Sequence, residues 1–126
     1  MPGYRPLGDD RNGEAEREAR AAEELVRNGD HAGAAVMLED AVRRCAASSA
    51  PMPPWLCGRL ATVYRTLQRY DDEVDLIARY RESQVTDEAR TRYDARRSKA
   101  EALAEKYRAR DSGALASIRR IKKPPR

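Results

Sequence analysis

Few residues in the chain have the type and spacing that catalysis requires. His31 is the only histidine, and the two cysteines, Cys45 and Cys57, form no Cys-x-x-Cys motif. A catalytic site needs a positioned nucleophile or a matched acid and base, and a structural zinc site needs four ligands. We therefore predict no catalytic residue, no cofactor and no metal ion. Both cysteines fall in apolar helical patterns, so we expect buried thiols rather than a disulfide.

One acidic run could offer carboxylates to a cation. Asp71, Asp72, Glu73 and Asp75 lie together just after Tyr70. Consecutive carboxylates on a helix point in different directions, which does not suit a shared ion. Negative side chains are favourable where the backbone dipole of a helix is positive. We interpret the run as the first turn of a helix.

The composition predicts a single all-α domain with a core of small side chains. Charged residues make up 37% of the 126 residues and aromatic residues 6%, with no phenylalanine, so Ala, Leu, Val and Tyr must build the core. No segment alternates apolar and polar residues over the length of a strand. No run approaches the roughly 18 apolar residues of a membrane span, and the N-terminus lacks the apolar core of a signal peptide. We expect a cytoplasmic protein with no membrane partner.

Apolar residues at helical spacing outline a first pair of helices. One stripe runs from Ala15 to Val26, and a second ends near residue 47. Between them, Gly29 can take the left-handed conformation that closes a helix, and Asp30 can cap the next one. Because the break is short, the two helices are expected to be antiparallel.

A second pair follows a connector with three prolines, residues 48–54. Pro54 can begin a helix, because proline is tolerated in a first helical turn. Residues 70–81 continue the apolar pattern in a fourth helix. Residues 86–110, with Thr86 as the capping residue, predict one long helix after the second pair.

These helices resemble the tetratricopeptide repeat, a helix–turn–helix unit that stacks side by side with its copies. The resemblance implies antiparallel hairpins stacked as a short right-handed α-solenoid with a long C-terminal capping helix. A generic irregular helical bundle is the alternative. The matching residues are Ala21, Ala22, Leu25, Gly29, Asp30, Ala34, Leu38 and Ala41 in the first pair, Leu60, Ala61, Tyr64, Tyr70 and Ile77 in the second, and Leu103, Ala104, Tyr107 and residues 111–118 in a partial third.

The chain also departs from the family pattern. Cys57 stands where the family usually has tryptophan, and Glu73 where the second helix of a repeat usually has alanine. Equivalent residues lie 39 positions apart from Leu25 to Tyr64 and 43 apart from Tyr64 to Tyr107, instead of the family's regular 34. We attribute the first excess to the proline connector and the second to the long helix.

By this resemblance, the first helix of each pair lines a concave groove that binds a peptide or a helix of another protein. Arginines in such a groove could hold the carboxylates of an acidic partner. An ordinary solvated helix face is the alternative, and Trp55 is either an exposed anchor or packs on the connector. The predicted partner-binding residues are Arg20, Glu23, Arg27, Trp55, Arg59, Thr62, Arg65 and Thr66.

Positive charge gathers at the C-terminal end. The net charge is +4, and residues 101–126 hold eight basic against three acidic residues. We expect residues 1–12 to be a flexible leader, residues 13–117 the helical domain and residues 118–126 a flexible basic tail. The tail could contact nucleic-acid phosphates or an acidic protein surface, although it lacks aromatic residues for base stacking. Its basic residues are Arg119, Arg120, Lys122, Lys123 and Arg126.

Three function classes follow from these patterns. The favoured class is a non-catalytic adaptor or scaffold that binds another protein. The second is a nucleic-acid-associated accessory or regulatory factor, and the third is an enzyme or a non-catalytic enzyme subunit. Homodimerisation through residues 86–110 is a further hypothesis, because about three repeats are needed for a stable stack.

Overall fold

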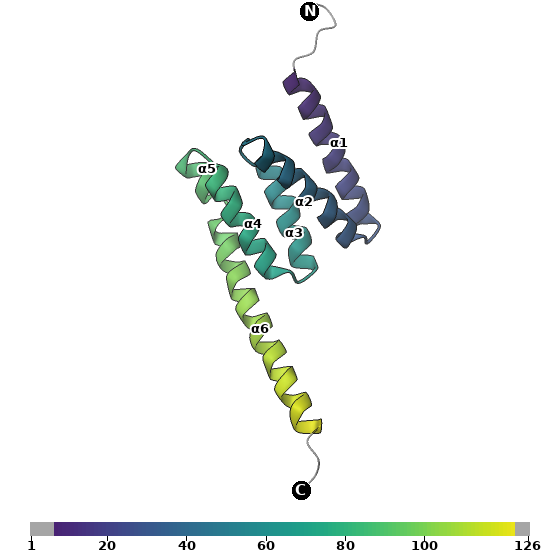
Figure 1. Cartoon of the computed structure of the whole chain (residues 1–126), viewed down its shortest axis with the longest axis vertical. Helices are drawn as coiled ribbons and strands as arrows, with labels where there is room; N and C mark the ends of the chain where they lie inside the picture. The colour runs from purple at the N-terminus through teal and green to yellow at the C-terminus, as the bar shows by residue number, and fades with distance from the viewer. Residues whose placement is uncertain (1–6, 123–126) are drawn as a thin grey trace, which may run out of the picture.

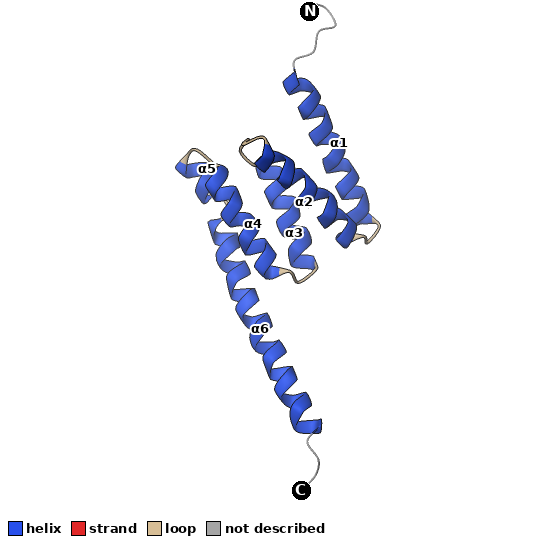
Figure 2. Ribbon diagram, in the orientation of Figure 1, coloured by secondary structure: helices blue, strands red, loops and turns tan. Residues whose placement is uncertain are grey.

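The computed structural model describes the backbone of residues 7–122 and the side chains of residues 13–110. All of the regular structure in this range is helical, which confirms the predicted all-α class (Figure 2). No helix among the described residues is long and apolar enough to cross a membrane. The helices are α1 (Leu7–Arg27), α2 (His31–Ala47), α3 (Pro54–Thr66), α4 (Tyr70–Ser83), α5 (Asp87–Thr91) and α6 (Asp94–Lys122).

Helices α1 to α4 each pack against their neighbours in the chain, and α6 packs against α4. α1 contacts α2, α2 contacts α3, α3 contacts α4, and α4 contacts both the short α5 and α6. Figure 1 shows the long helices side by side with alternating direction, and the C-terminal half of α6 runs on past the others. The chain therefore forms two helical hairpins, α1–α2 and α3–α4, with α6 alongside α4.

The residues at the helix ends behave as the sequence predicts. Gly29 has a φ of +83°, and the Asp30 carboxylate accepts a hydrogen bond from the Gly33 N–H at 2.8 Å. Thr86 caps α5 in the same way, because its hydroxyl accepts from the Ala89 N–H at 3.2 Å. Pro54 occupies the first turn of α3. The predicted starts of α2, α3 and α5 are thus confirmed.

Alanine forms much of the buried core. Ala34, Ala35 and Ala61 have no exposed surface, and within the described side chains α6 contributes Ala100 and Ala104 to the buried apolar residues. A side chain this small allows neighbouring helices to approach closely, as the composition suggested. Leucines, Ile77 and Tyr80 fill the remaining space.

The long helix predicted over residues 86–110 is broken near its start. α5 ends at Thr91 and α6 begins at Asp94. Between them, the Tyr93 hydroxyl donates to the Pro54 carbonyl oxygen at 2.8 Å, and its ring packs edge-on against Tyr80 with centroids 5.1 Å apart. These long-range contacts hold Tyr93 in place at the break, and the helical periodicity of the sequence does not predict them.

The helical part of the chain extends further at both ends than predicted. α1 begins at Leu7, inside the expected leader, and α6 reaches Lys122, inside the expected flexible tail. α6 also continues through residues 111–113, so the turn expected for a third pair does not form. A glycine weakens a helix by only about 1 kcal/mol, so the glycines in these stretches do not end it.

One buried carboxylate joins three helices. Glu73, in the first turn of α4, has no exposed surface. Arg65 of α3 donates to it from two nitrogens, at 3.1 and 2.8 Å, and Arg96 of α6 donates at 2.8 Å. Arg65 also donates to the Arg96 carbonyl oxygen at 3.3 Å. The carboxylate interpreted as part of a dipole-favoured first turn therefore also sets how α3, α4 and α6 lie against one another.

Replacement of Glu73 by alanine should destabilise the fold strongly. It would leave two guanidinium groups, on side chains 29% and 28% exposed, without their carboxylate. Breaking a buried ion pair from one side costs about 3–5 kcal/mol, and the partial exposure of the arginines favours the lower end. Urea unfolding followed by circular dichroism measures the loss. Asp75→Ala, at an exposed position of the same helix, is the matched control and should stay within about 0.5 kcal/mol of wild type. Equal stability of the two variants would contradict the role given to Glu73.

Candidate functional site

A groove runs between α1 and α3, the first helices of the two hairpins. Its cavity has a volume of about 640 Å³, and part of α2 also lines it. We call this cavity the α1–α3 groove. The predicted partner-binding residues that line it are Glu23, Arg27, Trp55, Arg59, Thr62 and Thr66.

Apolar side chains form the floor of the α1–α3 groove. Leu38 and Val63 lie there almost fully buried, while Val26 is 36% exposed. Trp55 is half-buried and packs against the core while still lining the groove. The sequence left open an exposed anchor or packing on the connector, and the structure instead places Trp55 against the core with part of its surface still accessible.

The polar groups at the groove already have partners within the chain. Arg59 forms an ion pair with Glu23, and Arg27 pairs with Glu24 at 2.8 Å. The hydroxyls of Thr62 and Thr66 donate to carbonyl oxygens of their own helix, at 2.9 and 3.1 Å. Exposed ion pairs contribute only about 0–1 kcal/mol, so a ligand could displace them at little cost. The groove is nevertheless not a patch of unpaired arginines.

Two of the predicted residues lie outside the α1–α3 groove. Arg20 is exposed and approaches Glu16 at 3.5 Å on the surface of α1. Arg65 stands at the edge of the predicted face of α3 and turns to the buried Glu73. The placement of Arg65 in the groove was wrong, because a buried carboxylate on another helix attracts its guanidinium more strongly than the solvent does.

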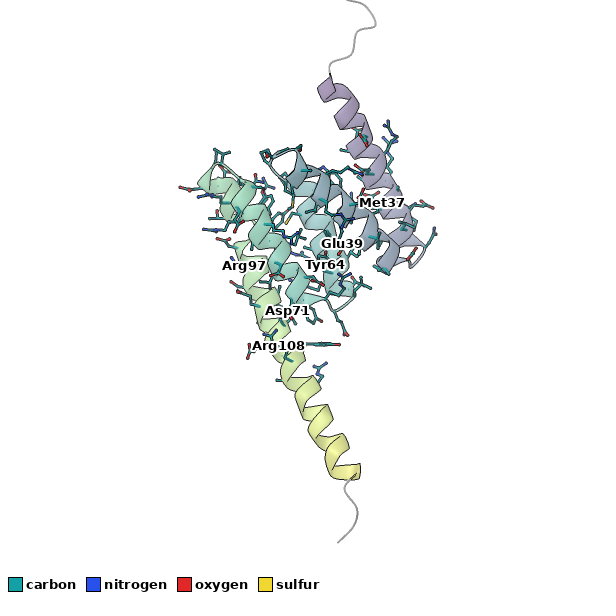
Figure 3. The ribbon with its side chains drawn as sticks, in the orientation of Figure 1. Met37, Glu39, Tyr64, Asp71, Arg97 and Arg108 are labelled. Atoms are coloured by element: carbon teal, nitrogen blue, oxygen red, sulfur yellow. The ribbon has the colours of Figure 1, made fainter. Side chains whose placement is uncertain are left out.

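A polar network that sequence reasoning missed lies between the two hairpins. The Tyr64 hydroxyl donates to Glu39 at 2.5 Å, and Arg69 donates to the same carboxylate at 3.1 Å while lying 4.7 Å from the centre of the Tyr64 ring. Figure 3 labels Glu39 and Tyr64 where α2 and α3 meet. Burial, and then the hydrogen bond to Glu39, raise the pKa of Tyr64. Only the position of Tyr64 in a repeat-like motif could have pointed to this contact.

The side chains that could act as nucleophiles, bases or metal ligands lie in surroundings that suit a structural role. Cys57 is fully buried, as expected, whereas Cys45 is only half-buried, and both are free thiols. Burial raises the pKa of Cys57 to about 12, which suppresses the nucleophilic thiolate. His31 is among the residues that line the α1–α3 groove. Within the described part of the chain, no group of His, Cys, Asp and Glu side chains is arranged to hold a metal ion.

The predicted tail residues fall at the edge of what the structure describes. Arg119, Arg120 and Lys122 belong to the helical backbone of α6, and their side chains lie outside the described residues. Lys123 and Arg126 lie outside the described backbone as well. Their role in binding stays a prediction.

Comparisons with known proteins give no match. No family model, no curated protein and no solved structure is similar enough to this chain to be reported as a relative. The resemblance to tetratricopeptide repeats therefore depends on the residues quoted above and stays a prediction.

The burial of the Cys57 thiol predicts a loss of stability at alkaline pH. Its pKa is about 12 in the folded chain and 9.0 when exposed, so above pH 9 the unfolded chain releases the proton first. Stability should fall by up to about 1.4 kcal/mol per pH unit for this group between those two values. Urea unfolding at several pH values from 8 to above 10 measures the slope.

The variant Cys57→Ala should show a shallower alkaline slope than wild type. The slope will not vanish, because burial also raises the pKa of Tyr64 and Tyr80. Cys45→Ala is the matched control and should change the slope less, since Cys45 is only half-buried. An unchanged slope in Cys57→Ala would show that deprotonation of Cys57 does not contribute to the loss of stability at alkaline pH.

Proposed function

We propose that this protein is a non-catalytic adaptor or scaffold that binds a segment of another protein in the α1–α3 groove. The observation that carries the proposal is the open apolar floor, which is formed jointly by α1, α2 and α3. An accessible apolar hollow between helices is a common docking site for a peptide or an amphipathic helix. A cytoplasmic location is part of the same proposal.

We further propose that the hairpins form a short right-handed solenoid of the tetratricopeptide type. The neighbour-to-neighbour packing of the helices supports this. So does the burial of the small residues Ala22 and Ala61 in the first helix of each hairpin. In this view α6 is the capping helix, because it closes the open side of α4 with Ala100 and Ala104.

The chemistry of the groove favours a partner with apolar side chains. The arginines expected to capture an acidic partner are paired, Arg59 with Glu23 and Arg27 with Glu24. Val26 and Trp55 offer apolar surface instead. Tryptophan is also among the residues that most often dominate binding energy at interfaces. We therefore expect the bound segment to be amphipathic, with its apolar face in the groove and its polar groups exchanging with the two ion pairs.

Blocking the groove should abolish partner binding. Thr66→Arg places a long charged side chain in the groove and should weaken the partner's affinity by about tenfold or more. Affinity purification from the native cell identifies a partner, and calorimetry with both purified proteins then measures the affinity. Thr91→Arg is the matched control, because Thr91 is also exposed and its hydroxyl also bonds the carbonyl four residues earlier. Equal affinity of the two variants would refute binding in the groove.

A second candidate is a nucleic-acid-associated accessory factor. The observation in its favour is that α6 continues as a helix to Lys122 and projects beyond the other helices (Figure 1). Residues 101–126 carry eight basic and three acidic residues, so a concentrated positive charge could follow this helix onto a phosphate backbone. Homodimerisation through residues 86–110 also stays a prediction.

Truncation after residue 117 tests the second candidate. It removes the five basic residues of the predicted tail. If these residues bind phosphates, gel shifts of duplex DNA and RNA should appear at low salt, weaken at moderate salt and disappear in the truncated chain. An equal gel shift of the nucleic acid by the full and the truncated chain would exclude phosphate binding by the tail.

A further inference from the structure

The side of α6 that packs on α4 continues beyond the point where α4 begins. Within the described side chains, Ala100 and Ala104 are the buried apolar residues of α6. Tyr107 follows on the same side and packs edge-on against Tyr70, the first residue of α4, with ring centroids 5.8 Å apart. α6 then runs on to Lys122, about 22 Å past Tyr107. Figure 1 shows no other helix of the described chain beside this part.

The spacing of the packed side is kept in the part of α6 that runs on. Ala100, Ala104 and Tyr107 are four and three residues apart, and the same alternation leads to positions 111, 114, 118 and 121. Positions spaced in this way fall on one side of a helix. Asp111 is the polar residue among them. We call the apolar residues at these later positions, with the adjacent leucine, the α6 stripe: Ala114, Leu115, Ile118 and Ile121.

The helix that already covers this side of α6 is acidic. The first turn of α4 contains Asp71, Asp72 and Glu73. Asp71 forms an ion pair with Arg108 of α6 at 2.9 Å, and Glu73 forms one with Arg96 at 2.8 Å. α4 therefore combines apolar packing on α6 with carboxylates that bind the arginines of α6.

The part of α6 beyond α4 has the same combination of apolar spacing and positive charge. Residues 109–122 hold four basic residues and one acidic residue. A second copy of the chain would bring like charges together, which is unfavourable. A nucleic acid would neutralise the charge but leave the apolar residues uncovered. An acidic helix matches both features. The basic residues are Arg110, Arg119, Arg120 and Lys122.

We propose that the α6 stripe binds a helix of another protein whose apolar residues are flanked by acidic ones. The partner helix continues along α6 where α4 ends, and its apolar residues cover Ile118 and Ile121. Its carboxylates pair with the basic residues beside the α6 stripe, as Asp71 pairs with Arg108. In such helix pairs the apolar positions form the contact, and the charges at its edges select the partner. This surface is separate from the α1–α3 groove.

Binding of a synthetic helix tests the proposal. The probe is a fluorescent peptide of about three heptads with leucine at positions a and d and glutamate at positions e and g. In a fluorescence anisotropy titration, the full chain should bind it at least about tenfold more tightly than a scrambled peptide of the same composition. A peptide with lysine at positions e and g is the second control. Equal affinity for either control peptide would overturn the proposal.

Two variants that add the same charge separate helix packing from simple charge attraction. Ile118→Lys interrupts the α6 stripe and adds a positive charge, and its affinity for the acidic peptide should be weaker than that of wild type by about tenfold or more. Val85→Lys adds that charge at a valine that is 87% exposed between α4 and α5. Its affinity should stay within about twofold of wild type, because distant exposed charges are screened. Equal affinity of the two variants, or tighter binding by Ile118→Lys, would contradict the proposal.

The location of the bound peptide is tested with the groove variant Thr66→Arg. This variant blocks the α1–α3 groove and should bind the acidic peptide as wild type does. Failure of the α6 stripe and failure of the groove are therefore distinguishable. Loss of peptide binding in Thr66→Arg would place the peptide in the groove and overturn the proposal.

Other occupants of the α6 stripe give different results with Ile118→Lys. Light scattering without peptide should give the same mass for wild type and for this variant. A wild-type dimer that the variant dissociates would overturn the proposal in favour of a second copy. Cosedimentation with vesicles of phosphatidylserine and phosphatidylcholine that the variant abolishes would overturn it in favour of a lipid surface.

Discussion

The structure depends on the buried carboxylate of Glu73. Burial of a charge is favourable only when partners surround it, and Arg65 and Arg96 reach it from the helices on either side of α4. The apolar contacts of α6 are modest, because Ala100 and Ala104 are its buried residues in the described range. In a core rich in alanine, this interaction adds directional contacts between α3, α4 and α6 to the apolar ones.

Further ion pairs join α6 to α4. Arg81 of α4 meets Asp94 at the start of α6. Arg108 of α6 meets Asp71 at the start of α4, and Figure 3 labels both residues. Exposed pairs therefore join both ends of α4 to α6, and the buried pair of Glu73 with Arg96 lies between them along both helices. Exposed pairs of this kind each add only about 0–1 kcal/mol of stability. The high charge content of the chain thus serves its internal packing as well as its surface.

Much of the fold could be predicted because its signals are local. The apolar spacing, the Gly29–Asp30 turn, the Pro54 start and the Thr86 cap each act within one or two helical turns. The break at Tyr93 could not be predicted, because the hydrogen bond that Tyr93 makes there joins it to Pro54 on another helix.

The candidate site shows the same division between local and long-range signals. Helical periodicity places Trp55, Arg59, Thr62 and Thr66 on one face of α3, and this face lines the groove. The same periodicity cannot tell which charged side chains at the edge of that face will leave it for a buried partner. Arg65 does so. The pairing of Arg59 with Glu23 could not be predicted from the periodicity of one helix either, because the two residues lie on different helices.

The length of α6 has a consequence for how the molecule moves in solution. A helix of 29 residues is about 43 Å long, and a large part of it extends past the other helices (Figure 1). Such a projection increases the frictional drag of a small protein. The monomer should consequently diffuse more slowly and elute earlier from a sizing column than a sphere of 14.2 kDa, so light scattering is needed to determine its mass.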